Sequence, residues 1–180
     1  AATINNVTSA DSLTVSTDAQ TLAFNNVAAM NITATGNFSE ISGAAGENLI
    51  IDSTASDVVV SNVSSTTITI AENTTVAQHL AGKRIASIAA NFVAAETKMQ
   101  ITFADGDYSG KTLNVNRKDT VVNVSGTPFS SIEINSDNVD LFTSGKEVNR
   151  LTVSNNVSYL MLDANVTTFN VTLDQPLTIH

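Results

Sequence analysis

The chain has 180 residues, a formal net charge of −9 at pH 7, no Cys or Trp, and an aromatic content of only 5%. Its acidity argues against nucleic-acid and anionic-membrane partners, because both are bound through cationic protein surfaces. The lack of Cys excludes disulfides and thiolate metal sites. No apolar run reaches the roughly 18 residues that a membrane-spanning helix needs. We therefore expect no nucleic-acid partner and no membrane insertion.

Short apolar segments, which we call pulses, recur in the first part of the chain at steps of nine or ten residues. They are rich in β-branched residues, and most alternate with polar residues as half-buried strands do. The Asn, Asp, Ser and Gly residues between them suit tight corners. The pulses centre on Ile4, Leu13, Leu22, Ile32, Ile41, Ile50, Val59 and Ile68.

This first array carries seven carboxylates between Asp11 and Glu72, and the first cation of the chain is Lys83. Acidic surfaces of this kind commonly keep a protein in solution. Divalent-cation binding and contact with a basic partner are the alternatives for this half of the chain.

A corner phrase recurs in which a polar residue is followed by Asn and then Val. Its spacings lie near multiples of twice the pulse step, so a similar corner returns at every second pulse. In stacked repeats the Asn amides could bond to one another in a ladder. Chance recurrence is the alternative, since Asn and Val are common in this chain. The proposed ladder residues are Asn6, Asn26, Asn62, Asn138 and Asn156.

Self-similarity at a fixed period is the signature of a solenoid, whose stacked coils complete one another's core. We therefore predict an all-β fold, a parallel β-solenoid or β-helix built of short strands. The competing fold is an antiparallel sandwich, in which short strands follow one another at a similar spacing. The scarcity of hairpin dipeptides, with Asp105-Gly106 the single Asp-Gly, favours the solenoid.

The pulses stop between residues 74 and 98. Thr75 and Gln78 have the spacing of a helix capping box, and Gly82 could end a helix. One long helix, or a short helix followed by a buried strand, are both compatible with this pattern. The apolar residues at multiples of four are Val76, Leu80, Ile88 and Phe92.

The pulses resume after this interruption with steps of eight to twelve residues. We accordingly predict a first β-solenoid segment over 1–74, a helical cap or junction over 75–97 and a second β-solenoid segment over 98–180. The second set of pulses centres on Ile101, Leu113, Val122, Ile132, Leu141, Leu151, Leu160, Phe169 and Leu177.

The start of the second segment has some features of a calcium loop. Asp105, Asp107 and Ser109 supply oxygens at alternate positions, and Gly110 follows. The twelfth position is Asn116, so the bidentate Glu of an EF-hand is missing. We interpret the segment as an acidic turn, with a weak calcium site as the alternative, and expect no other cofactor.

Candidates for catalysis are few. His79 lies in the predicted helix and His180 is the last residue, so no Ser-His-acid arrangement is indicated. Asp105 and Asp107 could form an acid and cation site for cutting an acidic polysaccharide, but residues at this spacing are typical of solvated turns. The cations nearest to them are Lys111, Arg117 and Lys118. We expect no enzymatic activity.

Threonine pairs, such as Thr33 with Thr35 and Thr67 with Thr69, resemble the flat faces of ice-binding proteins. The pairs do not recur at one coil position. Tyr108 and Tyr159 likewise form no evident row on which sugars could stack. These features favour neither an ice-binding nor a sugar-binding face.

The run Gln100-Ile101-Thr102-Phe103-Ala104-Asp105-Gly106-Asp107-Tyr108 resembles the phrase that opens the coils of right-handed parallel β-helix domains. The later run Arg150-Leu151-Thr152-Val153-Ser154-Asn155-Asn156-Val157 is similar to β-solenoid segments of bacterial surface and S-layer-associated proteins. The resemblance implies a fold and an exported, cell-surface location, and no catalytic residue can be transferred from it.

These observations together predict a non-catalytic structural, assembly or adhesion module of an exported bacterial cell-surface protein. Its partner would be a protein or glycan surface, or further copies of the chain. The alternative function is a polysaccharide-binding or polysaccharide-cleaving β-helix domain.

Overall fold

The computed structural model describes residues 1–71, 98–104 and 106–180, and all their side chains except those of residues 8 and 9. The helix and junction predicted over 75–97 lie outside the described residues, as do His79 and Asp105. The described residues form no helix. Their strands are β1 (Ala2–Thr17), β2 (Thr21–Gly36), β3 (Glu40–Ser42), β4 (Ala45–Ser53), β5 (Asp57–Ser61), β6 (Thr67–Ile70), β7 (Met99–Phe103), β8 (Thr112–Val115), β9 (Thr120–Val124), β10 (Ser131–Ile134), β11 (Val139–Val153), β12 (Tyr159–Val171) and β13 (Thr178–Ile179).

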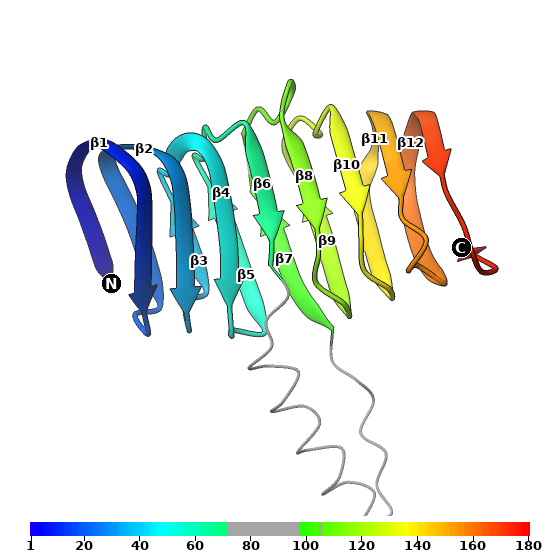
Figure 1. The fold of residues 1–180 in the computed structure, drawn as a ribbon, viewed down its shortest axis with the longest axis horizontal. Coiled ribbons are helices and arrows are strands. Elements are labelled where there is room, and N and C mark those ends of the chain that lie inside the picture. Colours follow the sequence, from blue (N-terminus) through cyan, green and yellow to red (C-terminus); the bar gives the residue numbers. More distant parts are fainter. Residues whose placement is uncertain (72–97, 105) are drawn as a thin grey trace, which may run out of the picture.

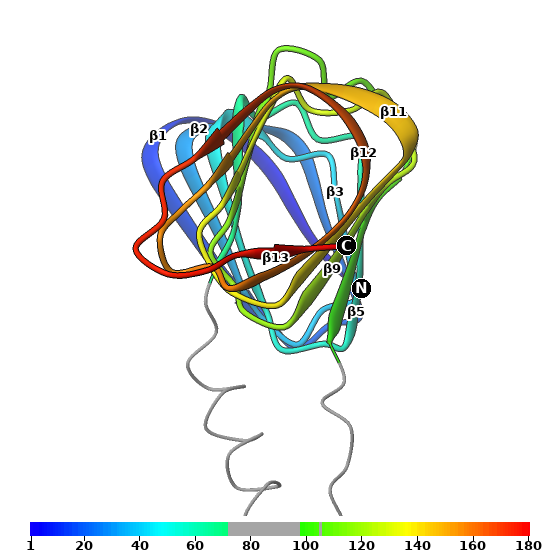
Figure 2. The ribbon, with the colours of Figure 1, turned by 90° about the vertical axis from the view of Figure 1, so that its right-hand side faces the viewer.

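Every pairing between these strands is parallel, and the chain stacks on itself about 19 residues further along (Figure 1). The prediction of an all-β parallel solenoid is confirmed. Each coil has two sides, seen along the stack in Figure 2. Face A contains the first parts of β1, β2, β11 and β12 together with β3, β5, β7, β9 and β13. Face B contains the later parts of the four long strands together with β4, β6, β8 and β10.

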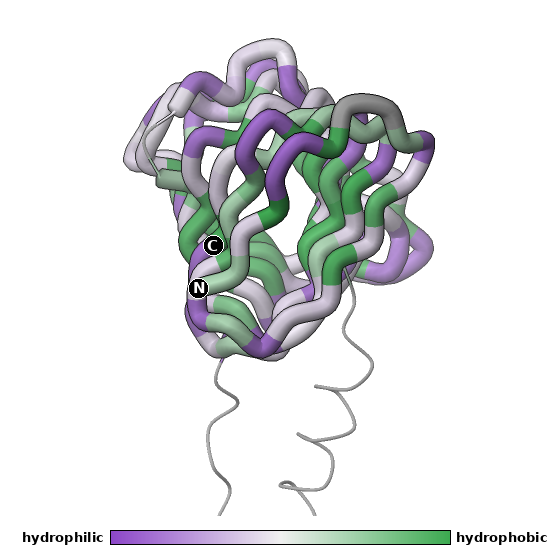
Figure 3. Tube along the Cα trace, turned by 90° about the vertical axis from the view of Figure 1, so that its left-hand side faces the viewer, coloured by the Kyte–Doolittle hydropathy of each residue, from purple (hydrophilic) through white to green (hydrophobic). Residues whose placement is uncertain are grey.

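The core consists of ranks of apolar side chains, one from each coil. Because a strand points alternate side chains to opposite sides, one face of each strand supplies this interior. Figure 3 views the stack from its N-terminal end and shows apolar residues on the coils. One rank on face B runs through eight coils as Leu13, Ile32, Leu49, Ile68, Leu113, Ile132, Leu151 and Phe169. A coil alone could not bury such residues, so stability depends on the stacking of neighbours.

The coils on either side of residues 72–97 are direct neighbours in the stack. β5 pairs with β7, where Val58 lies opposite Ile101, and β6 pairs with β8, where Ile70 lies opposite Val115. The first and second arrays of pulses therefore share one continuous set of ranks. Residues 71 and 98 both lie at the corner where the chain passes from face B to face A.

The two corners of each coil differ in their residues. Corner 1 leads from face A to face B, and corner 2 leads from face B back to face A. Several corner residues have positive φ, a conformation that Asn and Gly accept more readily than other residues. Those in the described chain are Asn6, Asn26, Asn62, Asp119, Asn138 and Ser144, with Gly36, Gly43, Gly110 and Gly145.

Asp137 joins two neighbouring coils at corner 2. Its carboxylate accepts hydrogen bonds from the backbone N–H of Ser158 at 2.9 Å and of Tyr159 at 2.8 Å, and from the Ser158 hydroxyl at 2.7 Å. Burial alone would raise the pKa of Asp137, but these bonds and one from Asn138 outweigh it, so the pKa falls below the usual 3.8. The ionised side chain is therefore the form that holds the corner.

We expect Asp137→Ala to lower the free energy of unfolding by about 1–2 kcal/mol at pH 7, because two backbone donors lose their acceptor. Since the folded-state pKa is depressed, this stabilisation is present above the ordinary pKa and is lost as pH falls through the folded value. Urea unfolding at pH 7, 5 and 3 would show the difference from wild type shrinking at the lowest pH. An undiminished difference at pH 3 would contradict the role of the ionised carboxylate.

Candidate functional site

The outer surface of face B carries two columns of mostly small polar side chains, which we call the face B columns. They alternate with the buried ranks along each strand, and the parallel register repeats them from coil to coil. The first column contains Ser12, Asn31, Asn48, Thr67, Thr112, Ser131, Arg150 and Thr168. The second contains Thr14, Thr33, Ile50, Thr69, Asn114, Glu133, Thr152 and Asn170.

Hydroxyl or amide groups occupy seven of the eight positions of the first column and six of the eight of the second. Thr33, Thr69 and Thr152 fall at one coil position and share it with Thr14. The two threonine pairs are offset, because Thr35 lies opposite Asp52 and Thr67 lies opposite Asn48, and the prediction that the pairs do not recur at one coil position is confirmed.

Hydrogen bonds between neighbouring coils order part of these columns. The Asn48 amide donates to the Asn31 side-chain oxygen at 2.8 Å, which leaves the two amides in a fixed relative orientation. The Arg150 Nε donates to the Ser131 hydroxyl at 3.4 Å, and Ser131 is buried while Arg150 is exposed. Rigid strands thus present a neutral array of donors and acceptors with few charges.

The structure divides the five proposed ladder residues between two corners. Asn6, Asn26 and Asn62 follow face A strands at corner 1, whereas Asn138 and Asn156 follow face B strands at corner 2. The Asn26 amide donates to the Asn6 side-chain oxygen at 3.0 Å. At the other corner the Asn138 amide donates to the Asp119 carboxylate at 2.6 Å.

The candidate calcium loop lies at corner 1, between β7 and β8. The Asp107 carboxylate accepts the backbone N–H of Ser109 at 2.9 Å, and hydrogen bonds with Ser109 are the main cause that lowers the pKa of Asp107. Both residues are exposed. Among the described residues, no group of three or more His, Asp or Glu side chains is placed to hold a metal ion.

The cations considered with Asp107 point to other partners. The Lys111 ammonium donates to the Ser64 carbonyl at 3.1 Å, one coil away at the same corner. Arg117 and Lys118 follow β8 at corner 2, whereas Asp107 precedes β8 at corner 1. The proposed residues of an acid and cation site are therefore not gathered around one point.

Tyr108 is 1% exposed, so its ring cannot act as a sugar-stacking platform. Its ring stacks on Phe129 at 4.8 Å and meets Phe103 edge to face at 5.6 Å. Its hydroxyl donates to the Ala104 carbonyl at 3.0 Å. This tyrosine anchors the loop between β7 and β8 to the core.

Arg117 is a buried cation that the sequence patterns did not single out as structural. It is 7% exposed, and its Nη1 donates to the Ser53 carbonyl at 2.7 Å. Burial raises the pKa of the nearby Asp52, an effect that the Arg117 charge opposes. Burial also lowers the pKa of Arg117, and Asp52 opposes that change. The pair therefore joins the corner 2 turns that follow β4 and β8.

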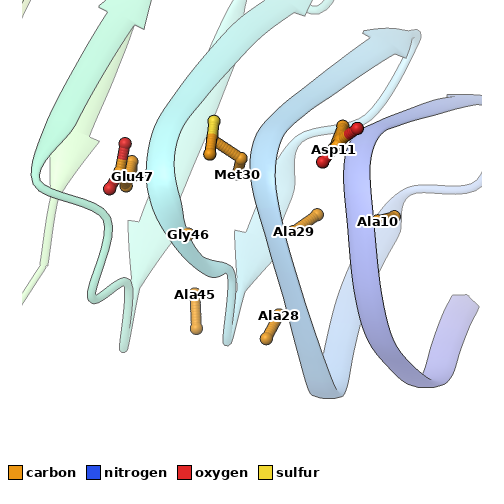
Figure 4. Close-up of a pocket in the computed structure, with 8 residues that line it drawn as sticks. All are labelled: Ala10, Asp11, Ala28, Ala29, Met30, Ala45, Gly46 and Glu47. Atoms are coloured by element: carbon orange, nitrogen blue, oxygen red, sulfur yellow. The ribbon is translucent and has the colours of Figure 1, made fainter.

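A shallow groove crosses the outer side of three N-terminal strands, β1, β2 and β4 (Figure 4). It is floored by small residues and flanked by Met30, Asp11 and Glu47, and its volume is about 470 Å³. The small residues are Ala10, Ala28, Ala29, Ala45 and Gly46. Small side chains leave room at this bend, and the groove holds no cluster of catalytic groups.

Comparison with known proteins finds no matching family model, no similar curated protein and no similar solved structure. In the part of the chain that the structure describes, no helix has the length and apolar character needed to cross a membrane.

Proposed function

We propose that this chain is a non-catalytic structural and adhesion module, exported to a bacterial cell surface, and that the face B columns form its binding face. The observation that carries the proposal is the repetition of hydroxyl and amide groups on successive coils of one rigid face. The cell-surface location is drawn from the resemblance of the sequence to bacterial surface β-solenoids.

A neutral array of this kind suits a neutral polysaccharide better than a charged polymer. Hydroxyl and amide side chains can both donate and accept hydrogen bonds, as sugar hydroxyls do. Coils repeat every 4.7–4.9 Å or so along the stack, which lets many weak bonds form along an extended ligand. The multiple contacts would add in the manner of multivalent binding.

The alternative, cleavage of an acidic polysaccharide, has less support. Its candidate carboxylate Asp107 is exposed on a turn, and Arg117 is buried at the opposite corner. No observation on the described residues favours it over the binding function.

The face B columns can be tested with the double variant Thr33→Lys/Thr69→Lys. We expect retention on purified bacterial cell walls or on an insoluble neutral polysaccharide to fall at least tenfold, equivalent to ~1.4 kcal/mol, because two long cations interrupt the array. Co-sedimentation at several protein concentrations would measure the change.

The matched control is Thr102→Lys, which places the same cation on the outer surface of face A. This control should bind as the wild type does, and circular dichroism should show all variants folded. Equal binding by the double variant and the wild type would overturn the proposal, as would absence of wild-type binding to both materials. Release of shortened chains from an acidic polysaccharide would favour the alternative instead.

A further inference from the structure

The groove over β1, β2 and β4 combines an apolar floor with acidic edges. Ala10, Ala29 and Gly46 lie opposite one another in the parallel register and form part of its floor. A side chain could not be added at Gly46 without moving the backbone, because its Cβ would lie 2.2 Å from the Ala29 carbonyl oxygen. The close approach of the coils at this bend therefore keeps the floor free of large side chains.

Met30 offers an apolar contact at the centre of the groove. It is 51% exposed, the largest value among the exposed large apolar side chains of the described residues. Asp11 and Glu47 flank it on the neighbouring strands (Figure 4). Methionine is flexible and polarisable, which suits it to contacts with partners of differing shape. Together with the exposed Ala28, Met30 forms a small apolar surface that is open to a ligand.

The edges of the groove carry negative charges that no neighbouring side chain balances. Asp11 and Glu47 are exposed, and neither carboxylate forms an ion pair or a hydrogen bond with another described residue. Residues 1–71 contain no Lys or Arg, so the strands that form the groove contribute no positively charged side chain. A surface of one sign attracts ligands of the opposite sign and repels those of its own sign. The groove is therefore complementary to a cationic ligand that also carries an apolar group.

The spacing of the two carboxylates distinguishes between kinds of cation. Asp11 and Glu47 lie two strands apart, which is ~9.6 Å at the usual strand spacing. A calcium ion needs about six to eight oxygen ligands, and the Ala, Gly and Met side chains between these carboxylates supply none. An extended peptide advances ~3.3 Å per residue and points alternate side chains to the same side, so a short segment can span the groove.

From this geometry we propose that the groove binds an extended basic segment of a partner protein. One apolar side chain of that segment packs on Met30, and a Lys or Arg two residues to either side meets Asp11 and Glu47. Such a contact is small, so the complex is weak and transient. The proposal concerns the groove alone and does not depend on what the face B columns bind.

The first experiment titrates the protein with a peptide of sequence Lys-Ser-Leu-Ser-Lys, blocked at both ends, and follows backbone amide shifts by NMR. We expect saturable shifts at residues 10–11, 28–30 and 45–47. A peptide with Glu in place of both Lys residues should cause none, and one with Ser in place of Leu should bind about threefold or more weakly. Absence of saturable shifts at the groove with the Lys peptide would overturn the proposal.

Two double variants separate the groove from the general acidity of the chain. Asp11→Asn/Glu47→Gln should weaken binding of the Lys peptide about tenfold or more, because both flanking charges are lost. The matched control Asp18→Asn/Glu40→Gln removes the same two charges at exposed positions outside the groove and should bind as the wild type does. Equal weakening in both variants would indicate nonspecific attraction to an acidic protein and overturn the proposal. All four side chains are exposed, and circular dichroism should show both variants folded.

The variant Met30→Ser tests the apolar contact. It should weaken binding of the Leu-containing peptide about threefold or more and leave binding of the peptide with Ser in place of Leu unchanged. Undiminished affinity for the Leu-containing peptide would show attraction by charge alone and contradict the proposed mode of binding.

Other occupants of the groove give distinct results in the same NMR experiment. Spermidine that binds to the groove as tightly as the peptide would assign it to small polyamines and overturn the proposal. Shifts at the groove that grow with protein concentration in the absence of peptide would assign it to a second copy of the chain, with the same consequence.

Discussion

Replacing Phe103 by alanine is expected to lower the free energy of unfolding by about 3–5 kcal/mol, the usual cost of removing a buried aromatic ring. Phe103 is fully buried and lies in a rank between Val60 and Val124. Its ring meets Phe129 edge to face at 5.1 Å and also contacts Tyr108. The loss would therefore include a cavity and two aromatic contacts. Urea unfolding followed by circular dichroism would measure this loss in the free energy of unfolding.

Phe142→Ala is the matched control, because Phe142 points outward from face A and is only half-buried. We expect it to cost about 1 kcal/mol or less, in the range of partly exposed substitutions. The same experiment on Phe103→Leu should give an intermediate loss, since leucine fills part of the cavity. A Phe103→Ala loss no larger than that of Phe142→Ala would show that the ring does not pack in the interior as described.

The Phe103→Ala change should also loosen the loop between β7 and β8. Tyr108 holds that loop to the core through its ring contacts with Phe103 and Phe129. Amide hydrogen exchange should therefore become faster at residues 106–111 than in distant coils.

Replacing Arg117 by methionine is expected to cost about 1.5–3 kcal/mol at neutral pH, because a buried charged hydrogen bond and a nearby electrostatic attraction are lost. The Ser53 carbonyl loses a charged donor at 2.7 Å, and Asp52 loses its neighbouring positive charge. Methionine preserves much of the side-chain volume, so the loss reports mainly on polar interactions. Lys118→Met is the matched control, because Lys118 is exposed and adjacent in sequence, and we expect it to stay within about 0.5 kcal/mol of wild type.

The effect of Arg117→Met should depend on pH through Asp52. Burial already raises the pKa of Asp52 in the wild type, and removal of the Arg117 charge would raise it further. An acid with a raised folded-state pKa favours the folded state at low pH and loses that contribution as pH rises through its pKa. The difference in free energy of unfolding between Arg117→Met and wild type should therefore become smaller as the pH falls from 8 to 5.

The double variant Arg117→Met/Asp52→Asn tests whether ionisation of Asp52 causes the pH dependence of the Arg117→Met effect. Asparagine does not ionise, so the stability of the double variant relative to Asp52→Asn should be nearly constant over the same pH range. A pH dependence that persists in the double variant would contradict the role assigned to Asp52. Unfolding in urea at each pH gives all four free energies needed for the cycle.

The kind of fold and several of the corner residues could be predicted from the sequence alone. Steps of nine or ten residues between β-branched pulses indicate short strands, and the nearly constant step length indicates that these strands stack. Both features can be read from short, repeated stretches of sequence. Likewise, Asn6, Asn26, Asn62 and Asn138 fall at turns with positive φ, which the Asn side chain tolerates.

Which repeats lie beside each other could be read only from the three-dimensional structure. Val58 pairs with Ile101 although residues 72–97 intervene between these neighbouring coils. The sequence spacing across this gap predicted that Asn62 and Asn138 lie at the same corner. In the structure they lie at two different corners. The same register places Thr33, Ile50 and Thr69 in one column although their spacings along the sequence are unequal.

Arg117 shows the same limit for a single side chain. In the sequence it is a surface cation between an Asn and a Lys, and only the stacking of coils brings it against Ser53 and Asp52. The burial of a side chain and its contacts with residues distant in sequence depend on the register between coils. That register depends on the length of each coil and on the residues that intervene between coils. The face B columns became visible for that reason once the coils were placed in register.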